Sequence, residues 1–449
     1  MKLKLENDKT KNLYMIIAFI HFAISFFLDT FLFKINIFII YNTSELIRLI
    51  IMKLISLMLY VFLWQKIGKI INNIRYKDDK TLKMLKYFFI NFGINIVLLI
   101  LTWPGIWRWD EFNILHHVSF YKLEYWQNYM TSIFYLLSYM LIPVPSGVII
   151  IQMAVASGIV SYIIYNFSKI FKNSKLIYLL YIPFLLLPVL DHNLYPLRLT
   201  LYSYIELLLI CQMIFIKKLG KCEKKDFLAL SIILIILCSY RTEGIVFMAL
   251  IPFIYVLMLK KEIPNIKQRI LYIILTFALS LLLIIPQESV YKKTYSGQYE
   301  VTSYVNQLHV VVKNELDNNP KSDELKTISK VINMKELMKY SRGIYAHNVG
   351  NLYKENTTEE DYSNLKKAYN KLLLKYPLDV IKERMQIFLT TSGFVNDYNV
   401  HVEDTRTIYT RIANRALLNF RTQYRTCYTT NKLEFEKFCY KYFRGTQYK

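Results

Sequence analysis

The residues best suited to chemistry in this chain are an acidic pair, Asp110 and Glu111, within the stretch PGIWRWDEFNILHH. Four of the five tryptophans lie from Trp103 to Trp126, on both sides of this pair. A carboxylate at a boundary between water and lipid can act as a general base on a sugar hydroxyl, or it can bind a divalent cation that neutralises a phosphate. Tryptophan rings also favour the headgroup level, so an aromatic belt beside an ordinary hydrated loop is the alternative.

Two arginines could supply positive charge to an anionic substrate. Arg198 follows the sequence DHNLYPL and begins the apolar run RLTLYSYIELLL, while Arg241 lies in CSYRTEGIVF with Glu243 as a local partner. A guanidinium can bind a phosphate with two hydrogen bonds, and a helix N-terminus adds the positive end of its dipole. Snorkelling of the arginines to lipid headgroups is the alternative.

Other polar residues give weaker signals. Glu206 lies inside an apolar run, and an acid within the membrane is by default a functional hypothesis, although tyrosine hydroxyls or an arginine could equally satisfy it. His116 and His117 are adjacent and would point about 100° apart on a helix. No metal-binding spacing surrounds them, and the nucleotide-binding glycine motifs and the GxSxG motif are missing from the sequence. We therefore expect no metal site at this pair, and chemistry on nucleotide sugars, ATP or serine esters loses support.

Composition indicates the elements that must position these residues. The chain has 449 residues, of which 54% are hydrophobic and 16% aromatic, with only 12 glycines. Its apolar runs match the roughly 20 residues that cross a bilayer as a helix, and an open sheet would leave its backbone unsatisfied in lipid. We therefore predict an all-α, polytopic transmembrane bundle, with about nine spans near 13–33, 46–64, 87–103, 146–165, 176–190, 199–216, 227–240, 244–259 and 270–287.

Charge sets the expected topology. The formal net charge is +23, but before residue 290 the basic residues lie mainly in short loops beside the apolar runs. This is the positive-inside pattern, so we expect a cytoplasmic N-terminus and no nucleic-acid partner. All basic loops fall inside only if the short run 129–142 is re-entrant or interfacial. The segments 34–45, 104–145, 191–198 and 241–243 then face outward, as does the chain after Gln287.

The sequence changes character at Glu288. We predict a transmembrane domain over 1–287, with the outer loop 104–145, and a mainly helical extracytoplasmic domain over 288–449. Helical periodicity supports the latter in SYVNQLHVVVKNEL and in DYSNLKKAYNKLLLKY, which ends near Pro377. Its last 49 residues hold ten Lys or Arg against four Asp or Glu and are expected to form a solvated or lipid-facing surface. Cys427 and Cys439 could form a disulfide there.

Several short motifs resemble those of one enzyme superfamily. These are an apolar span ending in WPG, an I-x-x-W-D loop, the aromatic stretch VSFYKLEYWQNYMTSIFYLL, then PLRLTLYS and YRTEG, together with TSYVNQLHVVV and YPLDVIKERMQIFLTTSGF. Over roughly residues 85 to 395 the chain resembles the GT-C membrane glycosyltransferases. More closely, it is similar to an uncharacterised bacterial group related to protein O-mannosyltransferases and aminoarabinose transferases.

The resemblance implies a function and roles for the site residues. Donors in this superfamily are typically polyprenyl-phosphate sugars, and the acceptor would be a glycan, lipid or protein of the cell envelope. Asp110 matches the acidic residue that acts as base or organises the acceptor, with Glu111 assisting and a divalent cation as an optional cofactor. Arg198 and Arg241 would hold the donor phosphate. The expected supporting residues are Trp126, Gln127, His192, Tyr195, Glu206 and Glu243.

The chain departs from this family at three places. Many relatives have His-Pro where this chain has Trp126, Gln127 and Asn128, and close relatives have Lys-Asp where it has Arg198 and Leu199. Relatives commonly continue with further C-terminal spans, whereas this chain ends in a polar tail, which would make it either a shortened variant or the product of a truncated gene. Two other functions stay open. A transporter or flippase for lipid-linked saccharides predicts a polar path across the bilayer, and a non-catalytic membrane protein predicts that Asp110 and the arginines lie apart.

Overall fold

The computed structural model describes residues 12–26, 43–107, 109–118, 121–172, 174–219, 224–263, 265–294, 297–339 and 351–391. These residues are mainly helical, and their only β-type pairing is an isolated bridge between Ile332 and Tyr353. They divide into two compact units, the first ending at Gln287 and the second beginning at Glu288. The predicted all-helical class is therefore confirmed for the described part of the chain.

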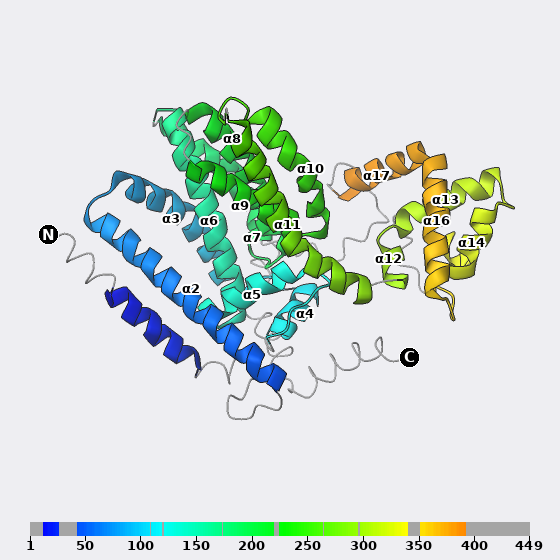
Figure 1. Ribbon diagram of the computed structural model, residues 1–449, viewed down its shortest axis with the longest axis horizontal. Helices are drawn as coiled ribbons and strands as arrows, with labels where there is room; N and C mark the ends of the chain where they lie inside the picture. The colour runs from blue at the N-terminus through cyan, green and yellow to red at the C-terminus, as the bar shows by residue number, and fades with distance from the viewer. Residues whose placement is uncertain are drawn as a thin grey trace. The chain divides into compact units, whose positions relative to one another are not determined.

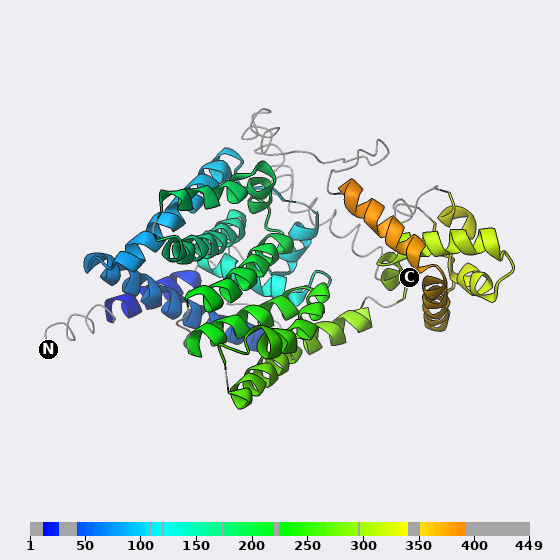
Figure 2. The ribbon, with the colours of Figure 1, turned by 90° about the horizontal axis from the view of Figure 1, so that it is seen from above.

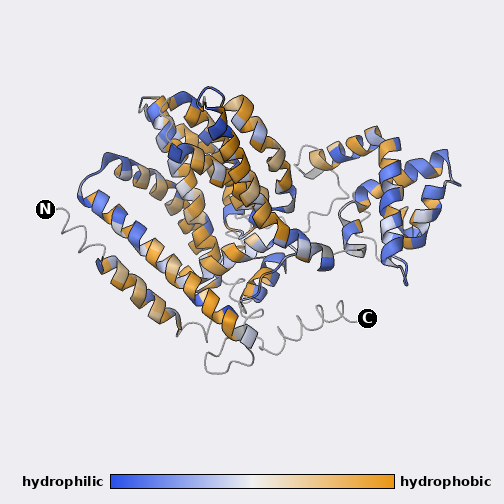
Figure 3. Cartoon of the chain, in the orientation of Figure 1, coloured by the Kyte–Doolittle hydropathy of each residue, from blue (hydrophilic) through white to orange (hydrophobic). Residues whose placement is uncertain are grey.

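Five helices of the first unit are long and apolar enough to cross a bilayer (Figure 3). They coincide with five of the expected spans. They are α2 (Thr43–Arg75), α3 (Asp79–Leu101), α6 (Pro145–Ile170), α8 (Arg198–Leu219) and α11 (Ile266–Thr294). The chain is therefore consistent with a multi-pass membrane protein, because only helices that satisfy their own backbone groups can stand in lipid this way.

Three other expected spans differ from simple long helices. The run 176–190 is a 3₁₀ helix, Lys175–Leu185, followed by α7 (Leu187–Asn193) after a bend of 68°. Pro183 lies within the 3₁₀ helix and has no N–H to donate, which disfavours a continuous α-helix. The runs 227–240 and 244–259 form α9 (Lys224–Tyr240), 17 residues long, and the composite helix Thr242–Met258, which contains α10 (Val246–Phe253).

The number of described helices long enough to cross a membrane is lower than the nine spans expected from the sequence. The described residues give five candidate spans, or six if the bent pair counts as one. A shorter helix, Asn12–Phe26, covers part of the expected span 13–33, whose remainder lies outside the described residues. The run 129–142 is α5 (Tyr129–Leu141), only 13 residues long and capped by Asn128. The figure of nine spans thus stays a prediction.

Polar side chains join the helices inside the first unit. α3 packs along α6, and α8 along α9 (Figures 1 and 2). Between α3 and α7, Asn193 Nδ2 donates to Asn95 Oδ1 at 2.9 Å, and Tyr204 Oη of α8 donates to Asn193 Oδ1 at 3.1 Å. Asn95 and Asn193 are almost completely buried. Such amides hold membrane helices together where apolar side chains gain little over lipid.

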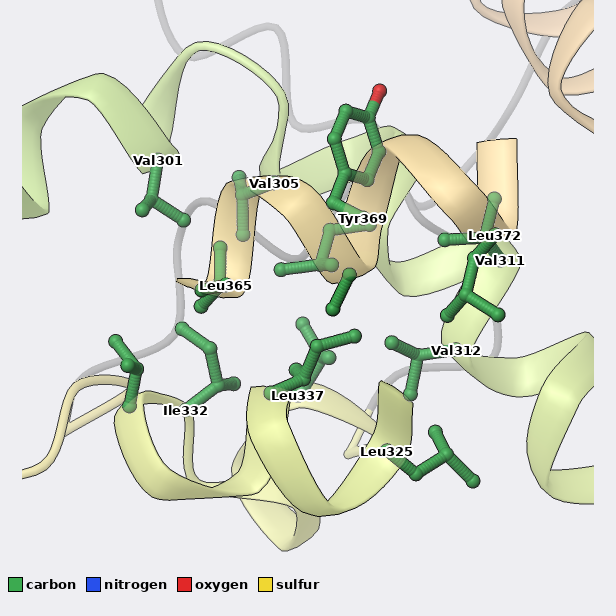
Figure 4. Close-up of a cluster of buried hydrophobic side chains, with 14 of the residues drawn as sticks. Val301, Val305, Val311, Val312, Leu325, Ile332, Leu337, Leu365, Tyr369 and Leu372 are labelled. Atoms are coloured by element: carbon green, nitrogen blue, oxygen red, sulfur yellow. The ribbon is translucent and has the colours of Figure 1, made fainter. Parts of the chain in front are cut away.

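The second unit is a small helical domain with its own core (Figure 4). Residues of several of its helices, including Val312, Leu337 and Leu365, are buried together. Thr358 and Asp361 form a capping box at the start of the next helix. This helix ends at Lys375, near the end predicted at Pro377, and Pro377 begins a further helix. The helices are α12 (Gln298–Thr302), α13 (Val305–Asn318), α14 (Asp323–Val331), α15 (Met334–Leu337), α16 (Glu359–Lys375) and α17 (Pro377–Thr391).

Candidate functional site

The acidic pair lies in the first turn of α4 (Trp109–Val118). Acidic side chains there stabilise a helix by interaction with its dipole, so part of their role is local. Asp110 is partly exposed, whereas Glu111 is only 2% exposed. Arg108, between the two tryptophans, lies outside the described residues. The pair is therefore held in a partly enclosed setting and not on an open loop.

The segment before α4 is fixed against the chain between α7 and α8. Gly105 has a φ of +95°, and a Cβ at this position would collide with Ile149 Cδ1 and lie 2.9 Å from Leu194 O. Glycine is thus required for this close approach. The next residue, Ile106, donates its N–H to Leu194 O at 2.9 Å. This contact sets the path of the chain that leads to Asp110.

The chain from Leu194 to Pro196 receives further hydrogen bonds from the surrounding helices. Tyr135 of α5, completely buried, donates to Pro196 O at 2.6 Å. Gln152 of α6 donates to Tyr195 O. Because these carbonyls precede α8, the position of Arg198 at the start of that helix is coupled to α4, α5 and α6.

Arg198 also contacts the segment before α5 directly. Its Nη1 donates to Gln127 O at 2.9 Å, and Gln127 is 6% exposed. Asn128 follows with a φ of +79°, accepts the Met130 N–H with its side-chain oxygen at 3.0 Å, and donates to Ser239 O at 2.9 Å. Asparagine tolerates this backbone region better than most residues. Trp126 is partly buried beside them.

Two buried tyrosines link the acidic pair to Arg198. Tyr135 interacts electrostatically with Asp110, Glu111 and Tyr240, and Tyr240 in turn interacts with Arg198. Both tyrosine side chains are at most 5% exposed. Residues from α4, α5, the end of α9 and the start of α8 are thus brought together. We call Asp110, Glu111, Tyr135, Tyr240 and Arg198 the polar cluster.

Arg241 is adjacent to this cluster but already has a carboxylate partner. Its Nε and Nη2 donate to Glu243 Oε2 and Oε1 at 3.2 and 3.1 Å, and its guanidinium lies 5.5 Å from the Tyr202 ring centre. Burial opposes ionisation of Glu243, but the bonds from Arg241 outweigh it and lower the pKa of this carboxyl, to which Arg198 also contributes. A phosphate at Arg241 would have to compete with Glu243.

Of the other predicted supporting residues, one lies near the polar cluster, and the described contacts of the other two lie outside it. Glu206, within α8, interacts electrostatically with Arg241 and so adjoins the cluster. Tyr195 is buried in an apolar group with Leu99 and Met153, which indicates a packing role. The His192 side chain is exposed, and its carbonyl accepts a hydrogen bond from Thr200 Oγ1 at 3.0 Å.

Some polar residues near the site were missed by sequence reasoning. Glu124 is 7% exposed, and its carboxylate accepts the Trp126 N–H at 2.7 Å and lies 3.5 Å from His117 Nε2. An acid within the aromatic stretch LEYWQN was the available signal, because a charged group among aromatic side chains needs polar partners when it is buried. Tyr135 and Tyr240 gave no such signal, since tyrosine is frequent throughout the chain.

A lysine inside a candidate span was also missed. Lys53 of α2 is 7% exposed, donates to Ser25 Oγ at 3.0 Å and lies 4.3 Å from the Phe26 ring centre. A charge in the middle of LIIMKLISL was visible in the sequence and is unusual within a membrane helix. It joins α2 to the helix Asn12–Phe26.

Comparisons with protein-family models, curated proteins and solved structures found no match to this chain. The described helices are consistent with a multi-pass helical membrane protein, and the resemblance to GT-C enzymes stays a prediction. Within the described ranges no three His, Cys, Asp or Glu side chains gather as a metal site. Asp110 and Glu111 are the carboxylates of the polar cluster that could face a cation or a hydroxyl.

Proposed function

We propose that this chain is a membrane glycosyltransferase that moves a sugar from a polyprenyl-phosphate donor to a cell-envelope acceptor. The observation that carries the proposal is the polar cluster, because two buried tyrosines, Tyr135 and Tyr240, connect a carboxylate pair to an arginine from segments that are distant in sequence. An acid that can accept a proton and a cation that can stabilise a phosphate are the two groups such a transfer needs.

We infer that the cluster acts at the outer face of a bacterial plasma membrane. On this topology the N-terminus is cytoplasmic, nine spans cross the bilayer, and the second unit is extracytoplasmic. The support is the distribution of lysine and arginine in the short loops of the sequence. Segments 104–145 and 191–198, which supply Asp110 and the carbonyls before Arg198, then share the outer side.

The proposed reaction is one displacement at the anomeric carbon of the donor sugar. An acceptor hydroxyl attacks this carbon, and its proton passes to the Asp110 carboxylate. The bond between the carbon and the phosphate oxygen breaks, and the polyprenyl phosphate leaves with the electron pair. Arg198 stabilises the departing phosphate by charge and hydrogen bonding. Glu111, which is more deeply buried, orients Asp110 and adds negative charge beside it.

The test uses the full chain in membranes with total lipid-linked saccharides from the source cells as donors. Release of free polyprenyl phosphate and the gain of sugar by envelope material are followed by mass spectrometry. We expect Asp110→Asn to lower release by roughly 10²- to 10⁴-fold, the usual contribution of a general base. Arg198→Gln is expected to raise the donor concentration needed for half-maximal rate.

Asp79→Asn is the matched control, because it makes the same chemical change at an exposed carboxylate paired with Lys83 at the start of α3. This variant should keep full activity. Unchanged release by the Asp110 variant would sink the catalytic role. Movement of the intact donor across the bilayer without release of polyprenyl phosphate would instead identify a transporter or flippase.

A further inference from the structure

The second unit carries an exposed apolar stripe that the proposed function does not use. Leu378, Ile381 and Met385 of α17 are 78%, 61% and 55% exposed, and Leu374 at the end of α16 is 82% exposed. The spacing 378, 381 and 385 is that of one helix face. Figure 3 shows hydrophobic residues among hydrophilic ones along α17, within a unit whose other helices consist largely of hydrophilic residues.

The stripe does not belong to the core of the unit. α17 packs against α13, and Val380 is the residue of α17 that is buried in the core. Successive residues of a helix are about 100° apart around its axis. If Val380 is placed at 0°, the three stripe residues occupy a sector of roughly 60° whose centre lies at about 130°. The helix therefore buries one edge in its own domain and presents a separate apolar face outward.

Charged residues on α17 are arranged around the stripe with a definite sign. With Val380 placed at 0°, the exposed Lys382 lies at about 200°, next to the stripe. Arg384 lies at about 40°, nearer to Val380, and its guanidinium donates to the Gln307 side chain of α13. Asp379 and Glu383 lie at about 260° and 300°, on the side remote from the stripe. An apolar face with a lysine at its edge and the acids turned away is the pattern of a helix that lies in a membrane interface.

The helix that joins this unit to the rest of the chain indicates that the partner of the stripe is a lipid surface. The unit begins at Glu288, inside α11, whose candidate span runs to Tyr291. Its tether is therefore a membrane helix, and a lipid surface accompanies every copy of the domain without any encounter in solution. A tethered surface has a high effective concentration, so a modest apolar stripe is enough for lasting contact.

We propose that α17 docks on the lipid surface, with Leu374, Leu378, Ile381 and Met385 inserted among the acyl chains. Lys382 contacts anionic headgroups at the edge of the stripe. The site recognises an anionic phospholipid surface and not one particular headgroup. The proposal does not depend on the glycosyltransferase activity.

The experiment measures the depth of a probe in the full chain, held as single copies in nanodiscs that contain phosphatidylglycerol. Cysteines replace Ile381 and Met385 one at a time and carry an environment-sensitive fluorophore. Gln386→Cys is the matched control, because this exposed neighbour lies about 100° round the helix from Met385. Cys211 and Cys238 are buried and can stay, whereas the remaining three native cysteines are replaced by serine.

Quenching by nitroxides on the acyl chains should be several-fold stronger at residues 381 and 385 than at 386, and iodide in the water should act in the opposite order. Strong iodide quenching at all three positions would overturn the proposal. Weak quenching by both agents at 381 and 385 would also overturn it, because the stripe would then be covered by protein. Leu378→Glu should convert the pattern at 385 to that of water exposure; since this side chain is 78% exposed, the change should not affect folding.

Discussion

The amide of Asn193 offers the sharpest test of how the helices of the first unit are held together. Its side chain joins Asn95 on α3 to Tyr204 on α8 through bonds of 2.9 and 3.1 Å. Replacement by leucine keeps the size but removes both bonds and leaves two buried polar groups without this partner. Side-chain hydrogen bonds between membrane helices contribute about 0.6 kcal/mol on average and about 1.7 kcal/mol at most.

Asn193→Leu should therefore lower the free energy of unfolding by about 1–3 kcal/mol, or roughly 5- to 150-fold in the equilibrium constant. The measurement is equilibrium unfolding of the full chain in mixed micelles with rising SDS. Asn166→Leu on α6 is the control, because this amide bonds within its own helix, to the carbonyl and the side chain of Tyr162. It should have a smaller effect than Asn193→Leu.

A triple variant tests the same hydrogen-bond network in a second way. A variant in which Asn95, Asn193 and Tyr204 become Leu, Leu and Phe loses the bonds but also loses the buried polar groups, so most of the stability should return. If this triple variant is as unstable as Asn193→Leu, the instability of Asn193→Leu does not come from buried polar groups left without a partner. A neutral Asn193→Leu would mean that the amide is not bonded as described.

Two further changes test other parts of the chain. Gly105→Ala should destabilise the first unit by about 2–4 kcal/mol in the same SDS titration, because positive φ and the contacts with Ile149 and Leu194 both oppose a Cβ; unchanged stability would contradict this. Tyr376→Phe removes a 2.7 Å bond to the buried Glu315 carboxylate and should cost about 1.5–3 kcal/mol at pH 7, seen as faster hydrogen exchange in α13. Burial opposes ionisation of Glu315, but bonds from Lys375 and Tyr376 outweigh it and lower its pKa below 4.5. The penalty should be full above pH 4.5 and disappear as pH falls through that lowered pKa; a penalty that persists in acid would show that the carboxylate is not involved.

Local features of the chain were readable from the sequence because they depend on near neighbours. Apolar length predicted the helical class and five of the long helices. α8 begins at Arg198, as expected, and Pro377 separates α16 from α17, since proline fits the first turn of a helix but not its interior. The candidate site residues were chosen from residue type and expected side of the membrane. Their roles remain the proposal made above.

Only the tertiary structure decided how those residues are connected. Tyr135 reaches the Pro196 carbonyl 61 positions away, and Arg198 reaches the Gln127 carbonyl 71 positions away. Carbonyl oxygens are the same at every residue, so no pattern of side chains reveals which ones are used. The same holds for the burial of Glu111. The pairing of Arg241 with Glu243, in contrast, was expected from their closeness in the sequence and is confirmed. Sequence determined which helices form, because that depends on neighbouring residues, whereas packing decided which polar groups meet, because that depends on where separate helices touch.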